Sequence, residues 1–244
     1  MPGWRVDPRS TRADRLVGVE RASWPGIGTV GLLDRALALL DAGPADGRGG
    51  RLILGIAGAP ASGKSTLAAL LMDDLETKRP GAGVAVGMDA FHIGHRILVD
   101  QGRTGIKGAP QTFDVLGYRH LLRRIREEAG PIYAPEFVRD IEDSLANVVE
   151  IGPEVRLVVT EGNYLLLNRP PWTGVRDLLD QAWFVRLDAD ERRRRMLLRH
   201  VRHGHDPEEA RTRTFGSDER NSQLVDSDPN RPDLLIEHLF APGQ

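Results

Sequence analysis

An apolar segment that runs directly into a glycine-rich loop, and then into a helical pattern, constrains the fold of this chain more than any other feature. The stretch reads LILGIAGAPASGKSTLAALL and covers residues 52–71. Its apolar run from Arg51 to Ala57 predicts a buried strand, and the apolar spacing from Ser65 to Leu75 predicts a helix. The first element pair is therefore a strand that feeds a helix through a tight turn.

The loop matches the pattern G-x-x-x-x-G-K-[ST], in the strand–loop–helix context that this pattern requires. Glycines let successive backbone N–H groups face phosphate oxygens, and the start of the helix adds the positive end of its dipole. Of the 33 basic residues only three are lysines, and Lys64 is compact enough to reach the β- and γ-phosphates where an arginine fork would crowd the loop. The loop is therefore predicted to bind ATP through Gly58, Ala59, Pro60, Ala61, Ser62, Gly63, Lys64, Ser65 and Thr66.

Short apolar segments alternate with helical patterns along the rest of the chain. Further strands are predicted at residues 83–89, 156–162, 182–188 and 233–240, and helices at 30–42, 114–128, 174–180 and 189–203. This alternation predicts an α/β fold with a doubly wound, five-stranded parallel sheet covered by helices on both faces. We expect one P-loop kinase domain over residues 50–244, and an N-terminal extension over 1–49 with one helix. Residues 1–24 are expected to be poorly ordered.

Composition narrows the classes of partner. The formal net charge of −2 gives no support for a nucleic-acid or membrane-surface partner, and no run of 18 apolar residues exists. The N-terminus lacks the apolar region of a secretory signal, so the cytoplasm is the expected compartment. The chain has no cysteine, which excludes disulfides, thiolate zinc sites and cysteine nucleophiles. We expect a small-molecule partner and a monomer or homodimer.

Two carboxylates stand at predicted strand ends, where ligands bind in open α/β sheets. Asp89 ends the segment GVAVGMD and could accept the proton of an attacking hydroxyl. Glu161 ends RLVVTEG and could hold Mg²⁺ together with the hydroxyl of Ser65. For each carboxylate, a structural role as a helix cap or turn residue is the alternative.

The segment DADERRRRMLLRHVRHGH, residues 188–205, carries six arginines. We interpret it as part of a lid, over about residues 189–216, that delivers arginines to the transferring phosphoryl group. Arg195 and Arg199 are four residues apart and so share one helix face. A solvated helix face, a nucleic-acid patch, and a metal site at its histidines are the alternatives.

The acceptor side is expected around the loop RTGIKGAPQTFD, residues 103–114, and the segment PIYAPEFVRDIED, residues 131–143. The candidate acceptor-binding residues are His92, Lys107, Asp114, Tyr133, Arg139 and Tyr164. An exposed loop cation is the alternative for Lys107, and buried structural rings are the alternative for the two tyrosines.

Several segments resemble the P-loop superfamily of uridine kinase, pantothenate kinase and phosphoribulokinase over about residues 50–238. They are GIAGAPASGKST, MDAFH, KGAPQTFD, VVTEGNYLLL and RHVRHGHDPEEARTR. The resemblance implies ATP, Mg²⁺, a five-stranded parallel core and an arginine-bearing lid, and it matches Asp89 to the carboxylate that serves as base. The chain departs from uridine kinases after Asp89, where Ala90, Phe91 and His92 follow. It also lacks the His-x-Arg end of their substrate loop.

The expected reaction is ATP-dependent transfer of the γ-phosphoryl group to a hydroxyl of a nucleoside, pantothenate or a sugar. A GTPase is disfavoured because the sequence has no N-K-x-D motif, and DVLG at 114–117 does not follow an apolar strand. A transporter-type ATPase is disfavoured because the sequence has no Leu-Ser-Gly-Gly-Gln signature. The alternatives are a nucleoside monophosphate kinase and a regulatory P-loop ATPase without a small acceptor.

Overall fold

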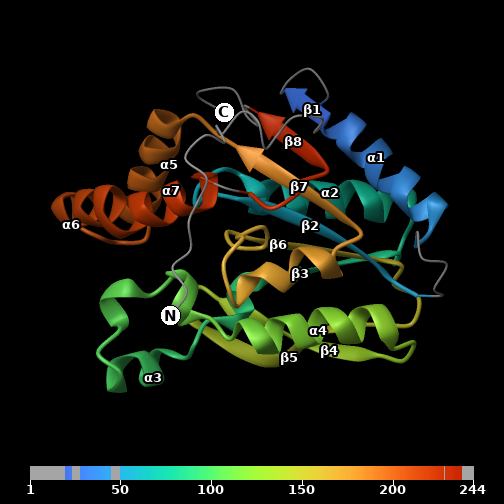
Figure 1. Ribbon diagram of the computed structural model, residues 1–244, viewed down its shortest axis with the longest axis horizontal. Helices are drawn as coiled ribbons and strands as arrows, with labels where there is room; N and C mark the ends of the chain where they lie inside the picture. The colour runs from blue at the N-terminus through green and yellow to red at the C-terminus, as the bar shows by residue number, and fades with distance from the viewer. Residues whose placement is uncertain (1–19, 24–27, 45–49, 228, 238–244) are drawn as a thin grey trace, which may run out of the picture.

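A parallel sheet of six strands forms the centre of the computed structural model, which describes residues 20–23, 28–44, 50–227 and 229–237 (Figure 1). The strands are β1 (Glu20–Ser23), β2 (Leu52–Gly58), β3 (Gly83–Gly87), β6 (Leu157–Gly162), β7 (Gln181–Arg186) and β8 (Leu234–Glu237). Their order is β1-β8-β7-β2-β6-β3, and every neighbouring pair is parallel. The five predicted strands and the α/β P-loop fold are confirmed.

Strand β1 was not predicted, because its sequence ERAS has no apolar pattern. It pairs with β8 at the edge of the sheet, where backbone hydrogen bonds suffice to define a strand. The expectation that residues 1–24 are poorly ordered is therefore wrong for residues 20–23, and residues 1–19 lie outside the described part. Strand β8 ends at residue 237, and the last predicted strand residues, 238–240, also lie outside it.

Helices cover both faces of the sheet because alternate residues of its strands point to opposite sides. In β2, Ile53 packs in the same core cluster as Tyr118 and Leu122 of α4 (Val115–Glu127). Its neighbours Leu52 and Leu54 pack instead with α1 (Gly28–Ala42) and α2 (Lys64–Lys78). The sheet is thus doubly wound, as predicted.

A two-stranded antiparallel hairpin, β4 (Ile132–Val138) and β5 (Asp143–Ile151), lies beside α4 (Figure 1). The sequence pattern does not predict it, because most of β5 is exposed and its apolar residues do not alternate. Only the end of the hairpin near Ile132 and Ile151 is buried. The rest of the ribbon projects beside the carboxyl ends of the strands and so becomes one wall of the site described below.

Three helices occupy the segment that the sequence predicts as a lid, at the end of the molecule opposite α1 (Figure 1). They are α5 (Ala189–Arg202), α6 (Pro207–Arg213) and α7 (Glu219–Ser227), with one π-helical turn at Thr214–Asp218. The helical segment therefore continues beyond residue 216. A short helix α3 (His95–Asp100) was not predicted. The helix predicted at residues 174–180 is wrong, because this proline-flanked segment forms only 3-10 turns at Trp172–Gly174 and Arg176–Leu178.

A buried hydroxyl pair connects α4 to the carboxyl ends of β3 and β6. The Thr160 hydroxyl donates to the Val86 carbonyl oxygen at 2.7 Å, and the Tyr118 hydroxyl lies 2.7 Å from the same Thr160 oxygen. Tyr118 and Thr160 are fully buried. Because Thr160 precedes Glu161 and Val86 stands three residues before Asp89, the pair fixes the strand ends that carry both carboxylates.

Removing either hydroxyl should lower the free energy of unfolding, and removing that of Thr160 should lower it more than removing that of Tyr118. Thr160→Val leaves the Tyr118 hydroxyl buried without its partner, which costs about 1–3 kcal/mol in the free energy of unfolding. Tyr118→Phe leaves the bond from Thr160 to Val86 intact and should cost about 1 kcal/mol. Urea denaturation of both variants and of the double variant measures this, and the double variant should lose less than the sum. An equal or greater loss for Tyr118→Phe would contradict this arrangement.

Candidate functional site

The loop between β2 and α2 has the backbone conformation of an anion-binding turn. Ala61 and Gly63 have φ values of 62° and 99°, and such left-handed residues turn neighbouring N–H groups toward one side. A left-handed alanine is strained, and strain of this kind concentrates at ligand sites. Ser62 is fully buried, and its hydroxyl has no hydrogen-bond partner among the described residues. The loop therefore fits a phosphate chain, as the motif predicts.

Lys64 is a buried cation at the first residue of α2, with 8% of its surface exposed. Burial lowers the pKa of its ammonium group, while the negative charges of Glu161 and Asp89 raise it. The P-loop lysine and both strand-end carboxylates thus lie within electrostatic reach of one another. The structure brings together three residues that the sequence analysis selected from three separate segments of the chain.

Parallel pairing of β3 with β6 places the two carboxylates at one edge of the sheet. Glu161 lies in register with Gly87, and Asp89 follows in the 3-10 turn at Met88–Phe91. Burial raises the pKa of Glu161, whereas Lys64 and a hydrogen bond with the Ser65 hydroxyl lower it. A serine hydroxyl beside a carboxylate is a pair of oxygen ligands suited to Mg²⁺. The donor set therefore fits the predicted metal.

A cavity of about 250 Å³ opens beside these residues, between α2, the end of β3 and the hairpin. Ser65, Asp89 and Glu161 line one side of it. Pro135, Phe137 and Arg139 line it from β4 and the turn that follows. The sequence singled out Arg139 but missed Pro135 and Phe137, although both lie in the segment 131–143. The available signal was the spacing of Tyr133, Pro135 and Phe137, which are two residues apart as on one face of a strand.

The lid brings one of its two predicted arginines to this site. Burial and the charge of Arg139 lower the pKa of Arg199, while Asp89, Asp218 and Glu161 raise it. Arg195 instead donates to Glu191 on its own helix, at 2.7 Å. Sharing a helix face was thus not sufficient to bring both side chains to Asp89 and Glu161.

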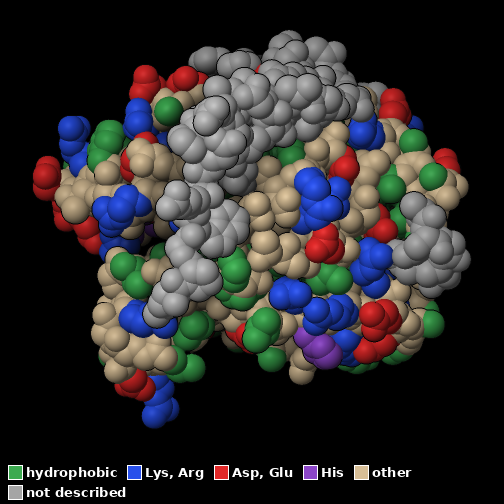
Figure 2. Space-filling model, in the orientation of Figure 1, with side chains coloured by type: hydrophobic (Ala, Val, Ile, Leu, Met, Phe, Trp, Pro, Cys, Tyr) green, Lys and Arg blue, Asp and Glu red, His purple; other side chains and the backbone are tan. Residues whose placement is uncertain are grey.

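Most of the other arginines at the start of α5 hold the lid together. Arg192 is buried and binds Glu219 and the Ser222 hydroxyl of α7, each at 2.7 Å. Arg193 also pairs with Glu219, at 2.8 Å. Figure 2 shows basic and acidic side chains interspersed over this face rather than gathered by sign. These arginines therefore form internal ion pairs and not one continuous basic surface on the visible face.

The lid histidines make separate contacts. His200 lies 2.7 Å from the carboxylate of Asp218, and His205 lies 3.2 Å from Glu209. His203 is exposed. Within the part of the chain that the structure describes, no three His, Asp or Glu side chains are grouped as a metal-binding cluster.

Four of the predicted acceptor residues have structural partners. Lys107 donates to the Glu142 carbonyl oxygen at 2.6 Å, and the Tyr164 hydroxyl donates to the Gly108 carbonyl oxygen at 2.6 Å. Asp114 caps α4 by accepting from the Gly117 N–H. His92 donates from Nδ1 to the Asp89 carbonyl oxygen at 2.7 Å. Tyr133 is half exposed on β4 and does not line the cavity. Contact of these residues with an acceptor stays a prediction.

Comparison with known proteins identifies the family of this chain. No family model matches the chain. A protein of Schizosaccharomyces pombe, provisionally named a uridine kinase, is 32% identical over 198 residues, which are 78% of this chain and 84% of that protein. The chain belongs to the uridine kinase-like family of P-loop kinases.

Two further similarities agree with this family. A crystal structure from Silicibacter sp. TM1040, provisionally named a fructose transport system kinase, superposes with a TM-score of 0.76 at 30% identity. It covers 86% of this chain and 99% of that one. The pantothenate kinase of Enterococcus faecalis is 31% identical over 140 residues, which are 57% of this chain and 45% of the pantothenate kinase. The chain is thus a P-loop small-molecule kinase, a phosphotransferase with an alcohol group as acceptor. No helix in the described part is long and apolar enough to cross a bilayer.

The half-buried His92, beside Asp89, predicts a pH-dependent loss of stability. Burial lowers the pKa of His92 from its ordinary value of 6.5, so below about pH 6.5 the unfolded chain binds a proton that the folded chain excludes. The free energy of unfolding should therefore fall as the pH drops through 6.5 toward the depressed value. His92→Asn keeps a donor near Nδ1 and should lose this part of the dependence.

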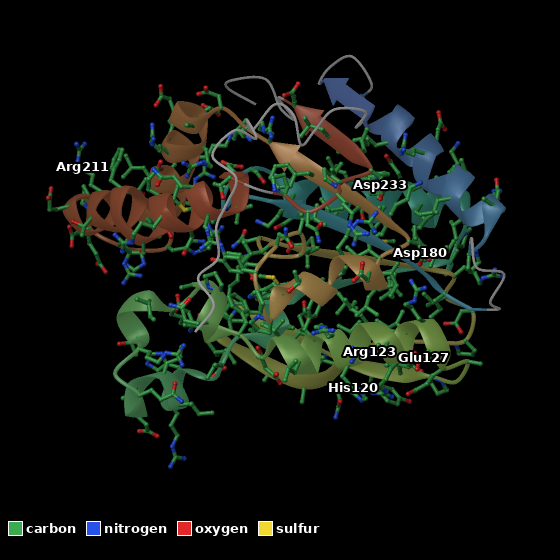
Figure 3. All side chains as sticks on the ribbon, in the orientation of Figure 1. His120, Arg123, Glu127, Asp180, Arg211 and Asp233 are labelled. Carbon is green, nitrogen blue, oxygen red and sulfur yellow. The ribbon has the colours of Figure 1, made fainter. Side chains whose placement is uncertain are left out.

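Urea unfolding of the wild type and His92→Asn between pH 5.5 and 7.5 measures the difference. His120→Asn, at an exposed position on the outer side of α4 (Figure 3), is the control and should leave the pH dependence unchanged. Parallel curves for the wild type and His92→Asn would contradict the prediction.

Proposed function

We propose that this kinase transfers the γ-phosphoryl group of ATP to a hydroxyl of a small polar acceptor held between Asp89 and the hairpin. The observation that carries the proposal is the convergence of Lys64, Asp89 and Glu161 beside a cavity that the hairpin closes on the other side. An ATPase without an acceptor would also use strand-end carboxylates, for Mg²⁺ and for the attacking water, but it has no need for the second wall that the hairpin supplies.

The chain's own residues divide into two groups around the transferred phosphate. The P-loop backbone and Lys64 bind the phosphate chain, and Ser65 with Glu161 supplies oxygen ligands for Mg²⁺. Bound Mg²⁺ would neutralise charge on the phosphate oxygens. Asp89 orients the acceptor hydroxyl and takes its proton, and Arg199 offsets the charge that develops on the phosphoryl group. The positions of these residues around the cavity support the division.

A coupled assay of ADP release tests the proposal. Nucleosides, pantothenate, ketohexoses and other sugars are offered in turn with ATP and Mg²⁺, because the related proteins carry names that refer to uridine, pantothenate and fructose transport. At least one acceptor should increase ADP release and appear as a phosphorylated product. ATP consumption that never depends on an added hydroxyl compound would favour a regulatory ATPase instead. The cytoplasmic location and the monomeric or dimeric state stay predictions.

Replacing the P-loop lysine should remove turnover without unfolding the protein. Lys64→Met takes away the cation that binds the phosphates while it retains a side chain of similar length in the same buried place. We expect kcat to fall by more than about 100-fold, the scale for removing one charge-stabilising group. Lys78→Met, at the exposed end of the same helix, is the control. Near-normal kcat in folded Lys64→Met would contradict the P-loop role.

Asp89→Asn should lower kcat and leave ATP affinity nearly unchanged. The amide is almost isosteric but cannot accept the hydroxyl proton, so kcat should fall by about 10²–10⁴-fold. If Asp89 is only a structural residue of the turn, the variant should instead have a lower melting temperature and an unchanged kcat per folded molecule. Both quantities are measured on one preparation, with Asp73→Asn on the exposed side of α2 as the control. Loss of stability without loss of rate would remove Asp89 from the mechanism.

A further inference from the structure

The cavity beside Asp89 has a cation on its far wall that the phosphoryl-transfer reaction does not require. We propose that the acceptor is a small hydroxy compound with an anionic group, a carboxylate or a phosphate, which binds Arg139 while the reacting hydroxyl faces Asp89. This inference rests on the proposed kinase function and specifies its acceptor. It adds Arg139 as the residue that determines specificity.

Arg139 comes from a different part of the fold than the phosphate-binding cations. Lys64 begins α2, and Arg199 comes from the lid helix α5. Arg139 instead follows β4, at the tip of the hairpin, and lines the cavity together with Asp89. The hairpin is the acceptor side of this cavity, because the P-loop and the two carboxylates form the other side. A ligand that spans the cavity can therefore meet Asp89 at one end and Arg139 at the other.

Arg139 is exposed, and its guanidinium makes no hydrogen bond or ion pair within the described part of the chain. The other candidate cations are engaged, since Lys107 binds Glu142 and Arg195 binds Glu191. An arginine offers five donors in a planar fork that matches a carboxylate or a phosphate. This guanidinium is thus available to a ligand in a way that Lys107 is not.

Three cations crowd this site, and an anion would relieve their repulsion. The positive charge of Arg139 disfavours the charged forms of both Lys64 and Arg199, so it lies within electrostatic reach of each. Asp89 and Glu161 are the carboxylates that face the same groups, and the charge of Arg139 also lowers the pKa of Glu161. The negative charges of the ATP phosphates would balance Lys64 and Arg199. A negative charge on the acceptor would account for Arg139.

The remaining walls restrict the rest of the acceptor. Pro135 and Phe137 give apolar surfaces on the hairpin side, against which a short carbon skeleton can lie, and Glu136 between them adds one carboxylate to this wall. At about 250 Å³ the cavity is smaller than the 300–1,000 Å³ that is common for drug-sized ligands. The geometry therefore favours a compact hydroxy acid or sugar phosphate over a neutral molecule of larger size.

Matched acceptor pairs test this assignment in the assay of ADP release. Glycerate is compared with glycerol, pantothenate with its alcohol panthenol, and fructose 6-phosphate with fructose. The wild-type enzyme should favour the anionic member of at least one pair by about tenfold or more in kcat/KM, and the pair identifies carboxylate or phosphate as the group. Arg139→Gln should raise KM for that acceptor about 10–100-fold, the scale of a charge-assisted hydrogen bond, and keep kcat and KM for ATP within about twofold.

Arg123→Gln is the matched control. Arg123 is exposed on the outer side of α4, next to His120 and Glu127 and away from the cavity (Figure 3). It should leave every acceptor preference unchanged.

Two kinetic outcomes would overturn the inference while the kinase function stands. One is a wild-type enzyme that phosphorylates the neutral members equally well or better. The other is an Arg139→Gln variant whose kcat falls equally for all acceptors, which would assign Arg139 to the phosphoryl group. If no compound supports acceptor-dependent ADP release, the proposed function fails. Calorimetric titration with glycerate, pantothenate and fructose 6-phosphate then tests the anion site. If Arg139→Gln binds each of the three compounds with the same affinity as the wild type, the anion site is rejected.

Discussion

The buried ammonium of Lys64 between two carboxylates is the interaction on which the rest of this site depends. Removing an ammonium from water costs several kcal/mol, and nearby negative charges offset that cost. Asp89 and Glu161 supply those charges from the ends of two other strands. The interaction therefore requires β2, β3 and β6 to be adjacent and parallel, which is the order that the sheet has. Fold and charge arrangement stabilise each other here.

The lid shows a second use of charge. Glu219 of α7 binds both Arg192 and Arg193 of α5, so one carboxylate cross-links two helices that are separated by α6 and a π-helical turn. Arg192 is almost fully buried, and breaking a buried pair of this kind leaves an uncompensated charge. The lid helices are therefore expected to move as one body. Any change in the position of Arg199 would then involve α7 as well as α5.

The sequence predicted the parts of the molecule whose physical cause is local. The glycine loop, five of the six strands and the three central charged residues follow from motif spacing and from the rule that the ends of parallel strands meet. Strand β1 depends on backbone pairing with β8, about 210 residues away, and its own side chains give no signal. The hairpin buries only one end, so its apolar pattern is weak.

Side-chain partners were the hardest feature to predict. Lys107, Asp114 and Arg195 have the residue types of a phosphoryl-transfer site, and the structure shows each bound to a neighbouring carbonyl, amide or carboxylate. Residue type indicates which chemistry is possible. Only the packed structure shows whether another part of the chain already satisfies it, as it does for Lys107 and not for Arg139 within the described residues.

The two adjacent residues Lys107 and Gly108 join the hairpin to the sheet. Lys107 binds Glu142 in the hairpin turn, and Gly108 accepts the hydroxyl hydrogen of Tyr164, three residues after Glu161. The loop is thus a cross-brace between an exposed ribbon and the rigid core. These two contacts would hold the hairpin at a fixed distance from Asp89 and Glu161 across the cavity. The enzyme would then select acceptors by the distance between their functional groups. A substitution at Lys107 or Tyr164 would change the preferred distance without altering the two residues proposed to bind the ends of the acceptor.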